Sequence, residues 1–152
     1  MPGPEEKLAE MGLAVPEVVP PLAAYVPAVR NGDLVFTAGQ LPARDGEMIA
    51  TGKLGAAVSE EQGYACARQC ALNALAAIKA EIGDLSAIKR IVKVVVFVAS
   101  TPDFTAHPKV ANGASELLGE VFGDAGRHVR SAVGVIALPL DVPVEVELVV
   151  AL

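Results

Sequence analysis

The chain has 152 residues, a net charge of −6, and a composition that is 53% hydrophobic but only 4% aromatic. A chain of this length forms one domain with its own core and needs no disulfide crosslinks. The negative charge repels nucleic acid at long range, and no apolar run reaches the roughly 18 residues that a membrane span requires. We therefore expect one domain over residues 1–152, no membrane segment and no nucleic acid partner.

The mean hydropathy, +0.47, is high for a water-soluble chain. Excess apolar surface on a small domain is often covered by sister subunits, so we expect a homo-oligomer. The first residues contain neither a basic segment nor an apolar run, which predicts no secretory signal and a cytoplasmic location. Cys66 and Cys70 lie four residues apart. They are expected to be reduced core side chains, and a metal or redox role is the less favoured alternative because further ligands are missing.

The N-terminal segment combines a short predicted helix with a stretch of proline-rich chain. Residues 4–11 form the helix, which is expected to end at Gly12. Residues 16–22 contain three prolines and predict extended chain. We therefore treat residues 1–22 as an N-terminal extension of the domain.

Two turns follow the extension. Residues 25–29 and 34–37 read as strands on either side of Asn31-Gly32, a pair that favours a two-residue type I′ hairpin turn. Asp45-Gly46 predicts a second turn, with a short strand at 48–50.

Two helices are predicted in the middle of the chain. Ser59 and Gln62 have the spacing of a capping box, and an apolar face continues to Ile82 before Gly83 ends the helix. A second helix is expected over 108–122, because proline suits the first position of a helix.

The strands of the second half alternate in polarity or are apolar throughout. Residues 88–99 are apolar on both faces, which predicts a central strand covered on both sides. Residues 129–137 and 144–152 predict two final strands joined by the proline-containing loop 138–143. The element order favours an α+β fold in which two helices pack on one face of an antiparallel or mixed sheet.

Charged residues on the last two strands need an explanation. Arg130 shares a strand face with Ala132 and Gly134, while Glu145 and Glu147 lie opposite the valine face of the final strand. Expecting these strands to be neighbours, we consider two interpretations. One is a cross-strand ion pair on a solvated face. The other is a pocket in which the planar guanidinium of Arg130 binds the carboxylate of a ligand.

The same residues belong to a longer pattern that resembles the RidA/YjgF family. The resemblance runs in order from Tyr25 to the C-terminus, and the form of residues 126–134 is similar to that of a longer subgroup of the family with an N-terminal extension. It rests on the following segments: Tyr25-Val26, Ala38-Gly39-Gln40-Leu41-Pro42, Val92-Lys93-Val94 with Phe97-Val98, Asp103-Phe104, Val110-Ala111-Asn112, Arg130-Ser131-Ala132-Val133-Gly134-Val135, Leu138-Pro139 and Val144-Glu145-Val146-Glu147.

The resemblance implies a chorismate-mutase-like fold and a trimer with ligand sites in clefts between subunits. It also implies hydrolysis of reactive enamines and imines, such as 2-aminoacrylate, to 2-keto acids and ammonia, without metal or cofactor. Arg130 would then bind the carboxylate of a small metabolite and Glu145 would position water. Tyr25 and Asn112 would line the cleft.

Two departures from the family pattern leave the activity open. Ala38, beside Gly39 in the expected site, stands where many members have a hydroxyl, and Ala132 stands where many have cysteine. Binding of a small carboxylate without catalysis is therefore the alternative to deamination, and ribonuclease action ranks last because the chain is acidic and poor in aromatic residues. His128 is either a proton carrier in the site or a solvent-facing turn residue. Gly39 and Gly126 are expected to serve the backbone, by permitting a positive φ or the close approach of other atoms.

Overall fold

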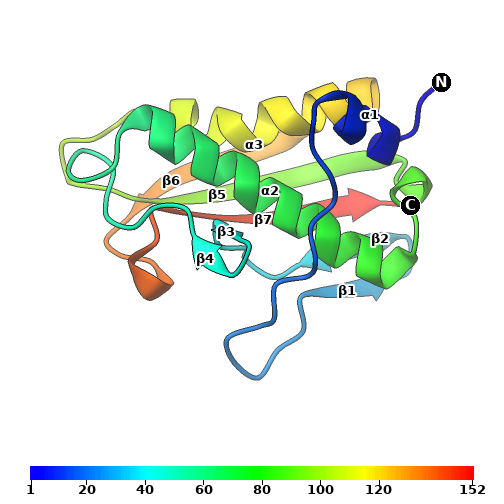
Figure 1. Ribbon diagram of the computed structural model, residues 1–152, viewed down its shortest axis with the longest axis horizontal. Helices are drawn as coiled ribbons and strands as arrows, with labels where there is room; N and C mark the ends of the chain where they lie inside the picture. The colour runs from blue at the N-terminus through cyan, green and yellow to red at the C-terminus, as the bar shows by residue number, and fades with distance from the viewer.

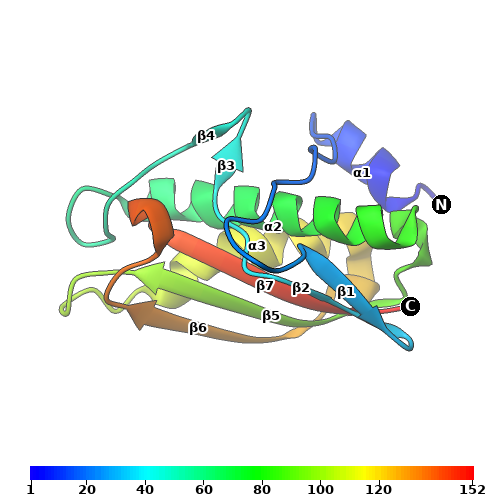
Figure 2. The same ribbon diagram turned by 90° about the horizontal axis from the view of Figure 1, so that it is seen from below.

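The computed structural model describes residues 1–152 and contains one five-stranded mixed sheet in the order β1-β2-β7-β5-β6. Figure 2 shows the two long helices on one side of this sheet and no helix on the other. The strands are β1 (Ala28–Asn31), β2 (Leu34–Thr37), β5 (Arg90–Ala99), β6 (Val129–Val135) and β7 (Val144–Ala151), with a separate short pair β3 (Ala43–Arg44) and β4 (Glu47–Met48). The helices are α1 (Pro4–Glu10), α2 (Glu60–Ile82) and α3 (His107–Phe122), together with three short 3₁₀ turns at Leu85–Ala87, Gly123–Gly126 and Pro139–Asp141.

Helix α2 begins and ends where the sequence predicts. The Ser59 hydroxyl accepts a hydrogen bond from the backbone N–H of Gln62 (3.2 Å), and the Gln62 side chain accepts one from the N–H of Ser59 (2.9 Å). Gly83 ends the helix with a φ of 85°, a conformation that disfavours residues with a Cβ. Both predicted end signals of this helix are confirmed.

The first hairpin differs from the prediction by one residue. Asn31 is paired with Leu34, so the two loop residues are Gly32 and Asp33, not Asn31 and Gly32. Only Gly32 has a positive φ, 62°, which is the pattern of a type II′ turn with glycine first. The first strand also starts at Ala28, later than predicted. The second turn is confirmed, since Asp45 and Gly46 both have positive φ.

The last two strands are not neighbours, which corrects the sequence prediction. Strand β6 pairs in parallel with β5, and β7 pairs antiparallel with both β5 and β2. The chain leaves β6 through residues 136–143 and returns on the far side of β5, as Figure 1 shows. Strand β6 is consequently an edge of the sheet.

The two faces of the sheet differ in burial. On the face under α2 and α3, Val94, Val96 and Val146 are fully buried. On the opposite face Val95 and Phe97 are only half-buried and Lys93 is exposed. The prediction that the central strand is covered on both sides is therefore wrong for a single chain. The uncovered face also carries the following exposed apolar side chains: Val29, Leu34, Phe36, Val129 and Val133.

The N-terminal extension is attached to the rest of the molecule. Leu8 of α1 is fully buried in the core, and Glu5 forms an ion pair with Lys79 of α2. Gly12, with a φ of 74°, ends the helix as predicted. The chain then crosses the outside of α2 before it reaches β1 (Figure 1).

Candidate functional site

The side chain of Arg130 is fixed against helix α3. Its register opposite Val94 places it on the helix-covered face of β6. Nη1 donates hydrogen bonds to Asn112 Oδ1 (2.9 Å) and Ser115 Oγ (3.1 Å), and Nη2 donates to the carbonyl of Pro108 (3.5 Å). The predicted pair Arg130 and Asn112 is thus in direct contact, in a half-buried position.

All three partners of Arg130 are uncharged. The ion pairs in the chain join Lys7 to Glu10 and Lys79 to Glu5, so no carboxylate neutralises this guanidinium. Of its five N–H bonds, three are used, which leaves Nε–H and one Nη2–H without a protein partner. A half-buried cation held by neutral groups has a strong preference for an anion.

His128 belongs to the same hydrogen-bond network. Its Nδ1 lies 2.6 Å from the carbonyl of Gly126, which requires a proton on Nδ1, and its Nε2 lies 2.8 Å from Ser115 Oγ. With the proton of the neutral ring on Nδ1, Nε2 accepts the hydrogen bond that the Ser115 hydroxyl donates. His128 is half-buried with both nitrogens engaged, so it is not a solvent-facing turn histidine. It positions Ser115, and through it Arg130.

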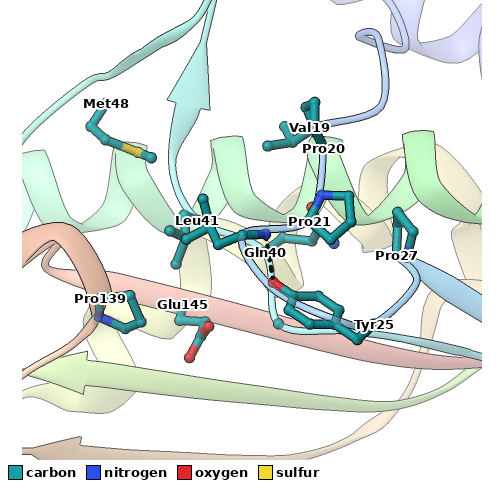
Figure 3. Close-up of a pocket in the computed structure, with 12 residues that line it drawn as sticks. Val19, Pro20, Pro21, Tyr25, Pro27, Gln40, Leu41, Met48, Pro139 and Glu145 are labelled. Carbon is teal, nitrogen blue, oxygen red and sulfur yellow. Dashed lines mark hydrogen bonds between the residues drawn. The ribbon is translucent and has the colours of Figure 1, made fainter.

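A pocket lies beside Glu145 on the other side of the sheet. It has a cavity volume of about 60 Å³ and opens to solvent, and Figure 3 shows Glu145 and Tyr25 among the side chains around it. The predicted residues Tyr25, Gly39 and Glu145 all line it, whereas Ala38 is half-buried next to it without lining it. The full lining is Val19, Pro20, Pro21, Leu22, Tyr25, Pro27, Gly39, Gln40, Leu41, Met48, Pro139 and Glu145.

Close approach explains the two predicted backbone glycines. Neither has a positive φ. A Cβ at Gly39 would lie 2.6 Å from Glu145 Oε1, and one at Gly126 would lie 2.4 Å from the carbonyl oxygen of Leu118. The carboxylate of Glu145 therefore rests directly on the backbone at position 39. Its burial raises the pKa of this carboxyl, and the nearby charge of Glu147 raises it further.

Arg130 and Glu145 do not meet within one chain. Strand β5 separates their strands, and its residue Phe97 pairs with Glu145 on the face opposite to Arg130. The interpretation as a cross-strand ion pair is therefore wrong. Instead there are two groups, the Arg130 network on α3 and the pocket beside Glu145.

The structure adds a polar pair that the sequence analysis did not select. Ser100 Oγ lies 3.1 Å from His107 Nε2, and the His107 ring packs edge-on against Phe104 at a centroid distance of 5.4 Å. A Cβ at Gly134 would lie 2.5 Å from the same nitrogen, so the ring rests on β6 on the face that carries Arg130. The sequence shows that Arg130, Ala132 and Gly134 share a strand face. It does not show that His107, at the start of α3, lies against that face.

The two cysteines are buried on helix α2, and the Cys70 thiol donates a hydrogen bond of 3.6 Å to the carbonyl of Val144, next to Glu145. Burial raises the pKa of Cys66 to about 11 and also raises that of Cys70. Both thiols are free and buried, and no cluster of three histidine, cysteine, aspartate or glutamate side chains is placed to hold a metal ion. None of the helices has the length and apolarity needed to cross a membrane.

Comparison with known proteins places this architecture in one family. Residues 5–152 match the model of the family described as "YjgF/chorismate mutase-like, putative endoribonuclease". The chain is 44% identical to Protein TCP17 of Trypanosoma cruzi over 146 residues, which are 95% of this chain and 91% of the relative. These matches extend over the predicted segments and the extension alike.

Solved structures agree with the family match. Protein Atu1372 of Agrobacterium tumefaciens, of unknown function, has a TM-score of 0.91 at 40% identity and covers 98% of this chain and 91% of its own. TdcF of E. coli, solved with bound serine, has a TM-score of 0.62 at 28% identity and covers 91% of this chain and 93% of its own. The fold is the chorismate-mutase-like fold, and this chain belongs to the RidA/YjgF family.

Proposed function

We propose that this chain is a cytoplasmic homotrimer that hydrolyses reactive 2-enamino and 2-imino acids to 2-keto acids and ammonia, without metal or cofactor. Its sites would lie between subunits, where Arg130 of one copy faces the Glu145 pocket of the next. One observation carries the proposal. The guanidinium of Arg130 is half-buried, fixed by α3 and paired with no carboxylate.

The separation of the two groups supports an inter-subunit site. Arg130 lies on the edge strand β6, where a neighbouring copy can approach, and the sheet face that carries Glu145 also exposes apolar side chains such as Phe36 and Val133. Apolar surface of this kind is typical of an interface between identical subunits. A second copy that covers this face and also reaches past the edge strand β6 would bring its Glu145 pocket to Arg130 of the first.

The reaction asks little of the protein, because an imine is already activated towards water. 2-Aminoacrylate first becomes the imine as a proton moves from nitrogen to its methylene carbon. Water then bonds to the imine carbon, the electron pair of the C=N π bond moves to nitrogen, and nitrogen takes a proton. The hydroxyl proton then moves to nitrogen as the C–N bond breaks, so that ammonia leaves and the keto group forms. Glu145, whose pKa is raised by burial, is suited to accept a proton from the attacking water and to return it.

Binding without turnover is the second candidate function. Ala38 and Ala132 provide no polar group beside the site, whereas Arg130 alone is sufficient to hold an anion. The serine bound to TdcF is a small molecule with a carboxylate, which supports this ligand class for either function. Ribonuclease action is disfavoured by the net charge of −6 and by the 4% aromatic content.

The test is to generate 2-aminoacrylate in situ with a dehydratase and to follow the loss of imine. We expect the wild type to accelerate the loss, and Arg130→Ala to reduce the acceleration at least tenfold, because a charge-assisted contact contributes roughly 1.5–3 kcal/mol. Arg127→Ala is the matched control, since Arg127 is an exposed neighbour with the same charge. No acceleration by the wild type would refute deamination, and full activity of Arg130→Ala would refute the assigned role.

Thermal shift with pyruvate separates the two candidate functions. Binding without turnover predicts stabilisation of the wild type and of Arg127→Ala, but not of Arg130→Ala, while imine loss stays at the rate in buffer.

A further inference from the structure

The N-terminal extension forms part of the pocket beside Glu145. Residues 16–22, which we call the strap, contribute Val19, Pro20, Pro21 and Leu22 to its lining. Figure 3 shows Val19, Pro20 and Pro21 together on one side of the pocket and Pro139 with Glu145 on another. The strap thus adds an apolar wall to a pocket whose reactive group is a carboxyl.

From this wall we infer that the strap determines substrate specificity, and that the preferred substrates are 2-imino acids with aliphatic side chains longer than a methyl group. The inference rests on the proposed function and deepens it. The carboxylate of the substrate would bind Arg130 of the neighbouring copy, its imine carbon would lie near Glu145, and its side chain would contact the strap.

The chain that leads into the strap is anchored to the core. Before it, Leu8 is buried in the core and Glu5 pairs with Lys79, while Met11 and Leu13 pack against the same core. Within the strap, three prolines fix their own φ angles and reduce the freedom of the chain. A pre-ordered wall loses little entropy when a ligand binds.

The end of the strap also contacts a predicted site residue. The backbone N–H of Leu22 donates a hydrogen bond of 3.4 Å to the hydroxyl of Tyr25, which is the dashed line in Figure 3. Because this oxygen accepts from the strap, the hydroxyl proton of Tyr25 is available to a ligand in the pocket. Position of the strap and orientation of Tyr25 are therefore linked.

The surroundings of the wall favour an aliphatic group. Leu41 and Met48 also line the pocket, and Glu145 is the one charged side chain in its lining. Each methylene that a ligand buries here contributes roughly fourfold in affinity. A three-carbon imine buries no such group against the strap, whereas the imine of leucine buries several atoms.

The strap offers a matched pair of adjacent valines. A second hollow, of about 750 Å³, is lined by the strap together with Gln69 and Asn73. Val18 lines only this second hollow, while Val19 lines the pocket beside Glu145 as well. The two valines have the same chemistry and belong to the same segment. They differ in whether they line the pocket beside Glu145.

The experiment compares the imines of leucine and alanine, each generated in situ by an L-amino acid oxidase in the presence of catalase. The readout is the ratio of kcat/KM for the leucine imine to that for the alanine imine. We expect a ratio of at least about ten for the wild type. Val19→Ser should reduce this ratio by roughly threefold to tenfold, while Val18→Ser keeps the wild-type ratio.

The outcomes distinguish a failure of the proposed role of the strap from a failure of the proposed function. A wild type that hydrolyses both imines with a ratio near one overturns the role of the strap and leaves the proposed function intact. Equal ratios for Val18→Ser and Val19→Ser also overturn it. A wild type that hydrolyses neither imine refutes the proposed function itself. Circular dichroism melting of both variants establishes that they fold.

Discussion

Gly39 lies so close to Glu145 that a methyl group at position 39 would come within 2.6 Å of the carboxylate oxygen Oε1. No Cβ occupies that distance without displacing its neighbour, and here the neighbour is the end of a side chain that can rotate away. The pairing explains why glycine is needed at a position whose φ is not positive. It also makes the position of Glu145 testable by one small substitution.

Gly39→Ala should displace the Glu145 carboxylate and lower kcat for imine hydrolysis at least tenfold, because a misplaced general base loses most of its effect. The matched control is Gly119→Ala, since a Cβ at Gly119 meets no atom within 4 Å. That variant should keep full activity and gain about 0.5–1 kcal/mol in stability from alanine in a helix. Equal activity of the two variants would contradict the importance of the contact.

Glu145 should also make the stability of the fold depend on pH. Burial raises its pKa above the ordinary 4.5, so the folded chain holds this proton more tightly than the unfolded chain. The contribution of Glu145 to the free energy of unfolding is then fully present below pH 4.5 and is lost as the pH rises through the raised pKa. Urea denaturation of the wild type and of Glu145→Gln across this range checks the effect.

The quantity to compare is the difference in unfolding free energy, Glu145→Gln minus wild type. Because glutamine does not ionise, this difference should increase with pH and then level off above the raised pKa. A difference that stays constant from acidic to neutral pH would show that Glu145 is not perturbed by its surroundings.

Asn112 offers a test of the anion site without loss of side-chain volume. Asn112→Asp places a carboxylate 2.9 Å from Nη1 of Arg130, where it neutralises the guanidinium and competes with the ligand. The affinity for pyruvate should fall at least tenfold by calorimetry, since a good ion pair contributes more than about 1.4 kcal/mol. Asn31→Asp, in the exposed first hairpin, adds the same charge far away and should bind pyruvate normally. Unchanged binding by Asn112→Asp would place the ligand elsewhere.

Cys66 and Cys70 should be unreactive in the native protein. Burial raises the pKa of Cys66 to about 11 and that of Cys70 as well, so almost no thiolate forms at neutral pH. A disulfide reagent should therefore label neither residue until denaturant is added, and both afterwards, as counted by mass spectrometry. Rapid labelling in native buffer would show that the helix opens or that the thiols are accessible.

Local signals in the sequence predicted much of the fold. The capping box at Ser59, the stop at Gly83 and the turn at Asp45-Gly46 are all present in the structure. Alternation along the last two strands also assigned the faces correctly, with Arg130 opposite to Ser131 and Glu145 opposite to Val146. These features depend on residues close together in the chain, which is why a single sequence indicates them.

Those local signals do not indicate which strands pair with one another. Two final strands with a short connection favour a hairpin, and nothing local indicates that β6 pairs in parallel with β5 while β7 pairs with β2. Ser115 was missed for a related reason, because its role follows from the crossing of α3 over Arg130. The sequence could suggest Arg130 and Glu145 as site residues, but not that one chain keeps them apart.

The central claim is that Arg130 of one subunit and Glu145 of another form one site, and mixing two inactive variants tests it most directly. Arg130→Ala and Glu145→Gln are unfolded together, refolded as a mixture in equal amounts and assayed for imine hydrolysis. In random trimers about a quarter of the inter-subunit sites combine an intact Arg130 with an intact Glu145, so we expect about a quarter of the wild-type activity. A mixture no more active than the separately refolded variants would contradict the claim.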